Sequence, residues 1–87
     1  MNIVITGAGK GIGLALVRRF LQSPDHNIWA CSRHVEALET IASPRLFIAT
    51  LDIATASASE ISEQISRHFN SVDILIHNAG VLINKPF

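Results

Sequence analysis

The sequence contains no tyrosine, only one cysteine and no net charge. Without tyrosine the chain has no phenol, which excludes every mechanism in which a phenol of this chain transfers a proton. A single cysteine, Cys31, cannot form an internal disulfide, and this is typical of a reducing compartment. Seven basic and seven acidic side chains cancel, so no overall field favours nucleic acid or an anionic membrane as a partner.

Long hydrophobic runs are also missing. No apolar stretch reaches the roughly 18 residues that indicate a membrane-spanning helix. The first apolar segment begins at Asn2, which leaves no room for a charged leader and a hydrophobic signal. We therefore expect a cytoplasmic protein with no membrane partner. The 87 residues, 48% of them hydrophobic, have the composition of one small globular domain.

Four of the five glycines fall close together near the start of the chain, at Gly7, Gly9, Gly11 and Gly13. They follow residues 2–6, an apolar run typical of a buried parallel strand. We expect the first three to form a tight turn whose bare backbone can approach a ligand. Gly13 is expected on the first turn of a helix, where a missing side chain allows close packing on the strand. Since a helix N-terminus presents free N–H groups, the pattern predicts a phosphate-binding loop.

Helix and strand patterns alternate along the chain. In the first helix, expected over residues 11–21, Ile12, Leu16 and Phe20 recur at four-residue steps with Ala15 beside them, and we expect this stripe to face the core. The remaining elements are expected in the following order: a strand at 26–31, a short helix with Ser32 as its N-cap, a strand at 45–51, a helix with Ile61, Ile65 and Phe69 on its inner face, and a strand at 72–77.

Right-handed crossovers fix how these elements lie in space. The first two helices carry the chain outward from the first strand along one face of the sheet. The third helix returns it to the other side of the first strand. The predicted fold class is therefore α/β: a three-layer, doubly wound parallel sheet, or half Rossmann fold, with strand order 3-2-1-4. Its ligand crevice is expected between the first and fourth strands.

Thr6, Gly7, Gly11 and Gly13 form the pattern Thr-Gly-x-x-x-Gly-x-Gly, which resembles the short-chain dehydrogenase/reductase family. The spacing fits neither Gly-x-Gly-x-x-Gly nor a triphosphate loop, because no Ser or Thr follows Lys10. The resemblance implies that residues 1–87 are a truncated NAD(P)-binding Rossmann domain, the cofactor half of the family fold. It places a dinucleotide against the turn and the helix start: Thr6, Gly7, Gly9, Lys10, Gly11, Ile12 and Gly13.

The adenosine ribose of a dinucleotide is met by a side chain about twenty residues beyond the glycine turn, and counting from Gly13 this is Arg33. An acid there suits a free 2′-hydroxyl, whereas an arginine suits a 2′-phosphate. Ser32 can donate a hydroxyl hydrogen bond to the same group, and Lys10 can reach it from the other side. One charge-assisted hydrogen bond, about 1.5 to 3 kcal/mol, gives roughly tenfold discrimination. We therefore expect NADP(H) to be preferred over NAD(H).

Two later segments add to the resemblance. Asp52 and Ile53 resemble the family's acidic dipeptide beside the adenine ring, although these two residues alone equally suit a turn. Asn78, Ala79 and Gly80 resemble the end of the Asn-Asn-Ala-Gly segment that lines the ribose and braces the sheet. All five are therefore candidate cofactor-binding residues.

His77 stands where that segment has its first Asn, which puts one bracing hydrogen bond in question. We expect it to be hydrogen-bonded at a buried strand end rather than catalytic. The family's Tyr-x-x-x-Lys has no counterpart, since the only lysines are Lys10 and Lys85. We expect no catalytic residue and, because no histidines share a four-residue spacing, no metal site.

Three functions remain open. The first is the NADP(H)-binding portion of a short-chain oxidoreductase that is inactive alone. The second is a non-catalytic NADP(H)-binding module or sensor that acts through a partner, and the third is a remnant that folds or oligomerises without ligand. Residues 72–77 would form an exposed apolar edge, and the sheet face opposite the third helix would lack a cover. We therefore expect a homo-oligomer or association with a complementing C-terminal fragment.

Overall fold

The computed structural model describes residues 1–78 of the chain. Strands and helices alternate in it as the sequence predicts. The elements are β1 (Asn2–Thr6), α1 (Gly11–Leu21), β2 (Asn27–Ser32), α2 (Glu36–Glu39), β3 (Leu46–Thr50), α3 (Ala58–Ser66) and β4 (Ile74–His77).

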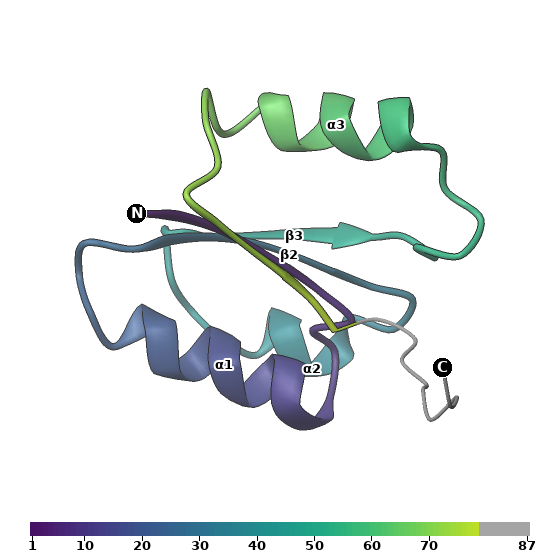
Figure 1. Cartoon of the computed structure of the whole chain (residues 1–87). Helices are drawn as coiled ribbons and strands as arrows, with labels where there is room; N and C mark the ends of the chain where they lie inside the picture. Colours follow the sequence, from purple (N-terminus) through teal and green to yellow (C-terminus); the bar gives the residue numbers. More distant parts are fainter. Residues whose placement is uncertain (79–87) are drawn as a thin grey trace, which may run out of the picture.

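The four strands form one parallel sheet in the order β3-β2-β1-β4, so the predicted fold class and strand order are confirmed. Helices α1 and α2 cover one face of the sheet and α3 covers the other (Figure 1). Because the strands are parallel, their carboxyl ends meet at one edge. The loops that follow β1, β2, β3 and β4 are therefore neighbours there, at the position where this class of fold binds ligands.

Two apolar clusters hold the layers together, one on each face of the sheet. Alternate residues of β1 divide between them: Ile3 and Ile5 pack under α1 and α2, whereas Val4 points toward α3. Trp29 is the largest fully buried side chain and lies in the cluster with Val4. Burial on both faces explains why residues 3–5 are continuously apolar.

The expected core-facing stripe of α1 is confirmed for Leu16 and Phe20, which pack against the first cluster, but not for its other two residues. Ile12 is 71% exposed and Ala15 is also exposed, whereas Gly13 and Val17 are buried. The physical reason is that Gly13 lies directly against Gly7, Ala8 and Asn78, where a side chain would collide. The face centred on Gly13 and Val17 turns Ile12 toward solvent.

Ser32 is not the N-cap of a helix, as the sequence suggested, but the last residue of β2. It pairs with Thr50 of β3, and its carbonyl accepts a hydrogen bond from the Leu51 N–H at 3.0 Å. Helix α2 begins only at Glu36, with Val35 in the N-cap position. Continuation of the sheet ladder by one residue thus displaced the expected helix start.

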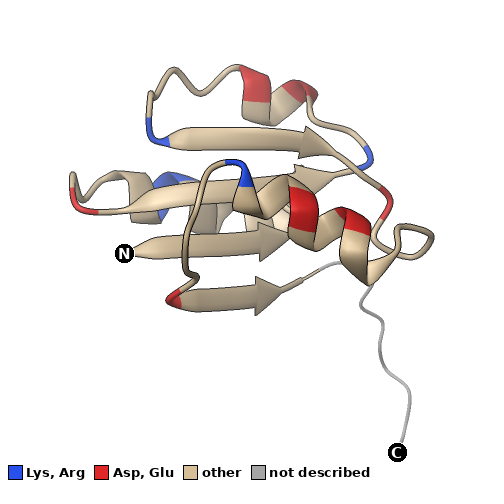
Figure 2. Cartoon of the chain, turned by 90° about the horizontal axis from the view of Figure 1, so that it is seen from above, with Lys and Arg blue, Asp and Glu red and all other residues tan. Residues whose placement is uncertain are grey.

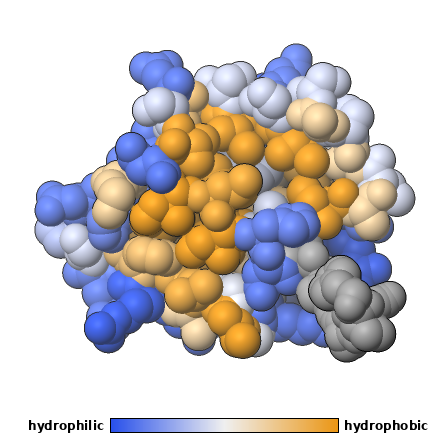
Figure 3. Space-filling model, in the orientation of Figure 1, coloured by the Kyte–Doolittle hydropathy of each residue, from blue (hydrophilic) through white to orange (hydrophobic). Residues whose placement is uncertain are grey.

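An exposed apolar surface lies along β4, the outermost of the described strands beside β1, and along the segment that leads into it. Leu75 is 64% exposed and Val72 is 42% exposed. Figure 3 shows this apolar surface gathered over β4, between α3 and α1. On the face opposite α3, Ile74 and Ile76 are only partly buried against the first cluster. Leu75, aligned with Val4, belongs to the α3 face.

Candidate cofactor-binding site

The glycine loop between β1 and α1 has the backbone conformation that the sequence pattern implies. Gly7 and Gly11 have φ angles of 64° and 60°, in the left-handed region that favours glycine. A Cβ added at Gly11 would meet no atom within 4 Å, so this position needs glycine for its backbone angle and leaves open space beside it.

Gly13 needs to be glycine because of its neighbours. A Cβ there would lie 2.4 Å from the Gly7 carbonyl oxygen and 2.8 Å from Asn78 Nδ2. The expected close packing of the helix start is thereby confirmed. At Gly9, a Cβ would meet the His34 carbonyl oxygen at 2.3 Å and Ser32 Oγ at 2.5 Å. The missing side chain at Gly9 therefore makes room for the β2–α2 loop.

The amino end of α1 is suited to an anion. Its N-cap residue, Lys10, has an extended backbone and an exposed side chain that makes no capping hydrogen bond. The first turn contains no acidic residue, and Ile12 projects into solvent beside it. The positive end of the helix dipole is therefore left without a negative side chain on its own first turn.

A hydrogen-bonded network joins the end of β4 to the glycine loop. Thr6, only 3% exposed, accepts a hydrogen bond from the Asn78 N–H at 3.1 Å, and its Oγ1 lies 2.9 Å from His77 Nδ1. Asn78 Nδ2 donates to the Gly7 carbonyl at 3.1 Å. His77 is exposed rather than buried as expected, yet it makes a bracing contact. The buried Thr6 side chain therefore holds the backbone of Asn78 in place beside the glycine loop.

The side chains assigned to the 2′-phosphate lie in adjoining loops. Lys10 and Arg33 are exposed, and Ser32 is partly buried. The contact between Gly9 and the Ser32–His34 segment brings these loops together at the carboxyl edge of the sheet. Charges of both signs are spread over the whole fold (Figure 2), so any anion recognition at this edge is local.

The loop after β3 supplies the remaining candidates. Asp52 and Ile53 are partly buried. Asp52 Oδ1 accepts from the Ala54 N–H at 3.0 Å, and its carbonyl accepts from the Ala56 N–H at 2.9 Å. Asp52 thus has the turn-forming contacts that its sequence position also allowed. Of the other candidates, Ala79 and Gly80 lie outside the described residues.

Residues that the sequence analysis did not single out complete the loop. Ala8 is fully buried, and its N–H donates to the Cys31 carbonyl at 3.0 Å. The position of this small residue between Gly7 and Gly9 is the feature of the sequence that could have predicted its burial. Burial raises the pKa of the Cys31 thiol to about 11, partly opposed by a hydrogen bond with the Gly7 backbone. The thiol is therefore protonated at neutral pH and packs as an apolar group. His34 contributes through its backbone, which no sequence pattern reveals.

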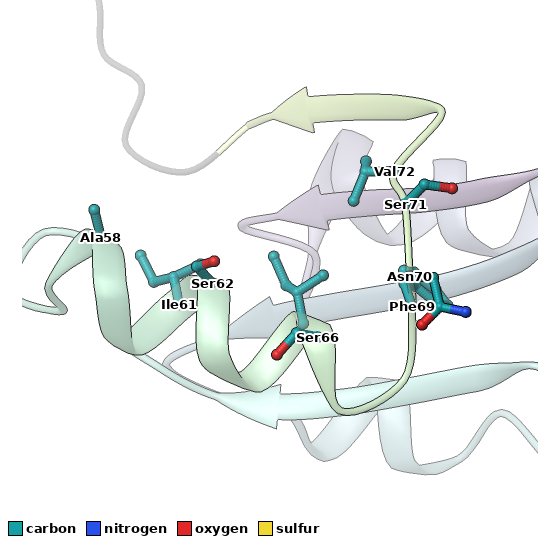
Figure 4. Close-up of a pocket in the computed structure, with 9 residues that line it drawn as sticks. Ala58, Ile61, Ser62, Ser66, Phe69, Asn70, Ser71 and Val72 are labelled. Carbon is teal, nitrogen blue, oxygen red and sulfur yellow. The ribbon is translucent and has the colours of Figure 1, made fainter.

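A groove of about 490 Å³ lies elsewhere, between α3 and the segment that leads into β4 (Figure 4). Ile61, Ile65, Phe69 and Val72 supply its apolar lining. None of the candidate cofactor-binding residues lines it. We assign the nucleotide site to the glycine loop rather than to this groove, because the loop has the N–H groups and cations that a phosphate requires.

Comparison with known proteins agrees with this geometry. The sequence model described as short chain dehydrogenase matches residues 1–87. The chain belongs to this family. A relative in Escherichia coli K12, the NADP-dependent 3-hydroxy acid dehydrogenase YdfG, is 32% identical over an alignment of 87 positions, which covers 95% of this chain and 35% of the relative. The chain thus spans about a third of the length of this short-chain dehydrogenase.

Solved structures show the same relation. The putative carbonyl reductase Sniffer of Caenorhabditis elegans superposes with a TM-score of 0.77 and 30% identity, over 94% of this chain and 37% of that one. The NADPH-bound carbonyl reductase from chicken fatty liver has a TM-score of 0.74 and 25% identity, over 98% of this chain and 36% of that one. Within residues 1–78, no helix is long and apolar enough to cross a membrane.

Proposed function

We propose that this chain is the NADP(H)-binding portion of a cytoplasmic short-chain oxidoreductase and that it binds the cofactor without catalysing hydride transfer alone. The observation that carries the proposal is the amino end of α1. There a left-handed glycine loop, a helix start without an acidic residue and the exposed Lys10 side chain come together. NADP(H) is the cofactor named for YdfG and for the chicken carbonyl reductase, which supports the choice of ligand.

The residues present fit such a cofactor. The open space beside Gly11 and the N–H groups of the first turn, including that of Ile12, would hold the pyrophosphate. Lys10 and Arg33 would neutralise the 2′-phosphate, and Ser32 would donate a hydrogen bond to it. Asp52, Ile53 and the segment 78–80 would meet the adenine and the ribose. When bound, the nicotinamide would supply a hydride to, or take one from, a carbonyl or alcohol carbon.

A titration of the purified chain with NADP⁺ and NAD⁺ tests the cofactor assignment. We expect NADP⁺ to bind about tenfold more tightly, because one charge-assisted contact to the 2′-phosphate is worth that much. Arg33→Ala should weaken NADP⁺ binding about tenfold and leave NAD⁺ binding nearly unchanged. Arg67→Ala, which removes an exposed arginine on the far end of α3, is the matched control. Equal binding of both dinucleotides by the wild type would contradict the preference, and binding of neither would contradict the function.

A second assay tests the absence of catalysis. The family's reaction uses a tyrosine, and this sequence contains none. We therefore expect no oxidation of NADPH by the chain alone with carbonyl substrates such as short 3-oxo acids. Turnover that follows the chain through purification and disappears in Gly13→Val would overturn this part of the proposal while leaving the cofactor assignment intact.

A further inference from the structure

Backbone conformation does not explain why residue 9 is a glycine. Gly9 is not among the glycines with a positive φ angle, which are Gly7 and Gly11, so an alanine could adopt its backbone angles. Its neighbours explain the residue instead. An added Cβ would lie 2.5 Å from Ser32 Oγ and 3.0 Å from Ser32 Cβ, and closer still to the His34 carbonyl oxygen. Because that oxygen belongs to the backbone, the segment that carries it would have to move.

The contact at Gly9 joins the two segments that carry the exposed cations of the site. Gly9 directly precedes Lys10 in the glycine loop. Ser32 and His34 are the two neighbours of Arg33 in the β2–α2 loop. The separation of the Lys10 and Arg33 backbones is therefore limited by how closely the two loops pack at Gly9. A larger residue at position 9 would increase this separation.

Hydrogen bonds on both sides of the contact determine which segment would yield. The Ala8 N–H donates to the Cys31 carbonyl at 3.0 Å, which ties the glycine loop to β2. The Leu51 N–H donates to the Ser32 carbonyl at 3.0 Å, which ties the last residue of β2 to the segment after β3. Residues 33–34 belong to neither β2 nor α2, and their side chains are exposed. A methyl group at position 9 should therefore displace residues 33–34 and leave the sheet and the glycine loop in place.

We propose that Gly9 is a positioning residue for cofactor selection. By admitting the β2–α2 loop against the glycine loop, Gly9 keeps Arg33 close enough to Lys10 for both cations to contact one 2′-phosphate. This inference rests on the proposed NADP(H)-binding function and adds a residue that acts on the 2′-phosphate through Arg33. Charge-assisted hydrogen bonds require separations of about 2.7 to 2.9 Å, so a small outward displacement of the loop weakens them. The pyrophosphate, which NADP⁺ and NAD⁺ share, meets the amino end of α1 and is not displaced.

Titration of Gly9→Ala with NADP⁺ and NAD⁺ tests this role. We expect the preference for NADP⁺ to fall from about tenfold to about threefold or less, because the Arg33 contact is weakened. Binding of NAD⁺ should change by less than about twofold, since the amino end of α1 stays in place. Gly11→Ala is the matched comparison. Its methyl group enters the open space where the pyrophosphate would lie, so it should weaken both dinucleotides alike and leave the preference near tenfold.

A double-mutant cycle tests whether Gly9 acts through Arg33. In an Arg33→Ala background the loop no longer carries the charge whose position Gly9 sets. Adding Gly9→Ala should then change the remaining preference by less than about twofold, so that the two substitutions are not additive. Additive losses would show that Gly9 affects the 2′-phosphate by another route and would overturn the positioning role.

The displacement of the loop can be measured without any dinucleotide. In the amide spectrum of Gly9→Ala, the signals of residues 33–34 should shift. The Leu51 N–H should keep its protection from hydrogen exchange, because its bond to the Ser32 carbonyl lies on the side of the loop that is held. Circular dichroism of the same sample shows whether the variant is folded.

The outcomes separate this inference from the proposed function. A folded Gly9→Ala with shifted residues 33–34 and an unchanged preference for NADP⁺ would overturn the inference and leave the proposed function standing. A variant that does not fold would also overturn it, because the contact would then serve the fold rather than selection. A wild type that binds neither dinucleotide would overturn the proposed function, and the selective role of Gly9 with it, even where the loop shift is seen.

Discussion

Burial gives the Cys31 thiol a different pKa in the folded chain from that in the unfolded chain. The unfolded thiol titrates near 9.0, whereas desolvation in the folded chain raises the pKa to about 11. The folded state thus keeps its proton where the unfolded state has lost it. The free energy of unfolding should be unaffected by this group below pH 9 and should fall as the pH rises from 9 to 11. At about 1.4 kcal/mol per pH unit, the loss approaches 2 to 3 kcal/mol.

Urea unfolding at neutral pH and in this alkaline range measures the effect. The control is Cys31→Ala, which has no thiol to titrate. Its stability will be lower throughout because of the cavity, but it should decline less across the same interval. Parallel pH profiles for the two proteins would show that the thiol is not the cause.

Substitution by alanine should lower the free energy of unfolding by different amounts at Gly11 and at Gly13. Gly11→Ala adds a methyl group in open space and costs only the left-handed backbone, about 1 to 2 kcal/mol. Gly13→Ala drives a methyl group against the Gly7 carbonyl, which is backbone and cannot swing away. We expect Gly13→Ala to cost about 3 kcal/mol or more, by overpacking. Chemical denaturation of both variants decides the order, and a larger loss for Gly11→Ala would contradict the loop geometry.

Among the elements, α1 is held at its carboxyl end by a side chain from just before β3. The Arg45 guanidinium donates to the Ser23 and His26 carbonyls at 2.7 Å and to the Leu21 carbonyl at 2.9 Å. These carbonyls belong to the end of α1 and the turn beyond it. A cation there also complements the negative end of the helix dipole.

Arg45→Met should therefore lower the free energy of unfolding by about 2 to 3 kcal/mol, since partly buried carbonyls lose a charged donor. Arg45→Lys retains the charge but cannot reach three acceptors as a planar fork does, so it should recover less than half of the loss. Thermal unfolding followed by circular dichroism measures both. Arg18→Met, on the exposed face of α1, is the control and should change stability by less than about 0.5 kcal/mol.

The order of the elements could be predicted from the sequence because each has its own periodicity and crossovers have one hand. Which residues of each element face the core could not be predicted in full. In α1 the four-residue steps of Ile12, Leu16 and Phe20 predicted the core-facing stripe, and the close packing of Gly13 was expected separately. The two patterns together did not predict that Ile12 would face solvent. Similarly, the sequence around Ser32 favours a helix N-cap, whereas in the structure Ser32 pairs with Thr50 as the last residue of β2.

The candidate site was predictable where backbone geometry dictates the residue, as at Gly7 and Gly13. It was not predictable where a contact joins distant segments. The hydrogen bonds from Asn78 to Thr6 and Gly7 span more than seventy residues. The pairing of β4 with β1 was predicted from the crossovers, but which groups of the two segments would form hydrogen bonds was not, because that depends on side-chain positions in the folded chain.

Because the whole chain is small, ligand binding should raise its thermal stability by a measurable amount. A chain of 87 residues buries a limited core and is marginally stable, so binding contributes a large fraction of the total. At a ligand concentration of about 100 times the dissociation constant, binding adds about 2.7 kcal/mol. For a domain of this size that raises the melting temperature by roughly 10 to 20 °C.

NADP⁺ should therefore give a rise of this size, and NAD⁺ at the same concentration, if it binds tenfold more weakly, about half as much. Arg33→Ala should reduce the NADP⁺ shift to that of NAD⁺. Leu75→Lys should leave the difference between the two shifts intact, because β4's outer edge and the glycine loop are separate surfaces and distant sites act additively. Loss of the shift in Leu75→Lys would mean that the edge and the cofactor site are coupled, and a shift that is equal for both dinucleotides would remove the case for the 2′-phosphate contact.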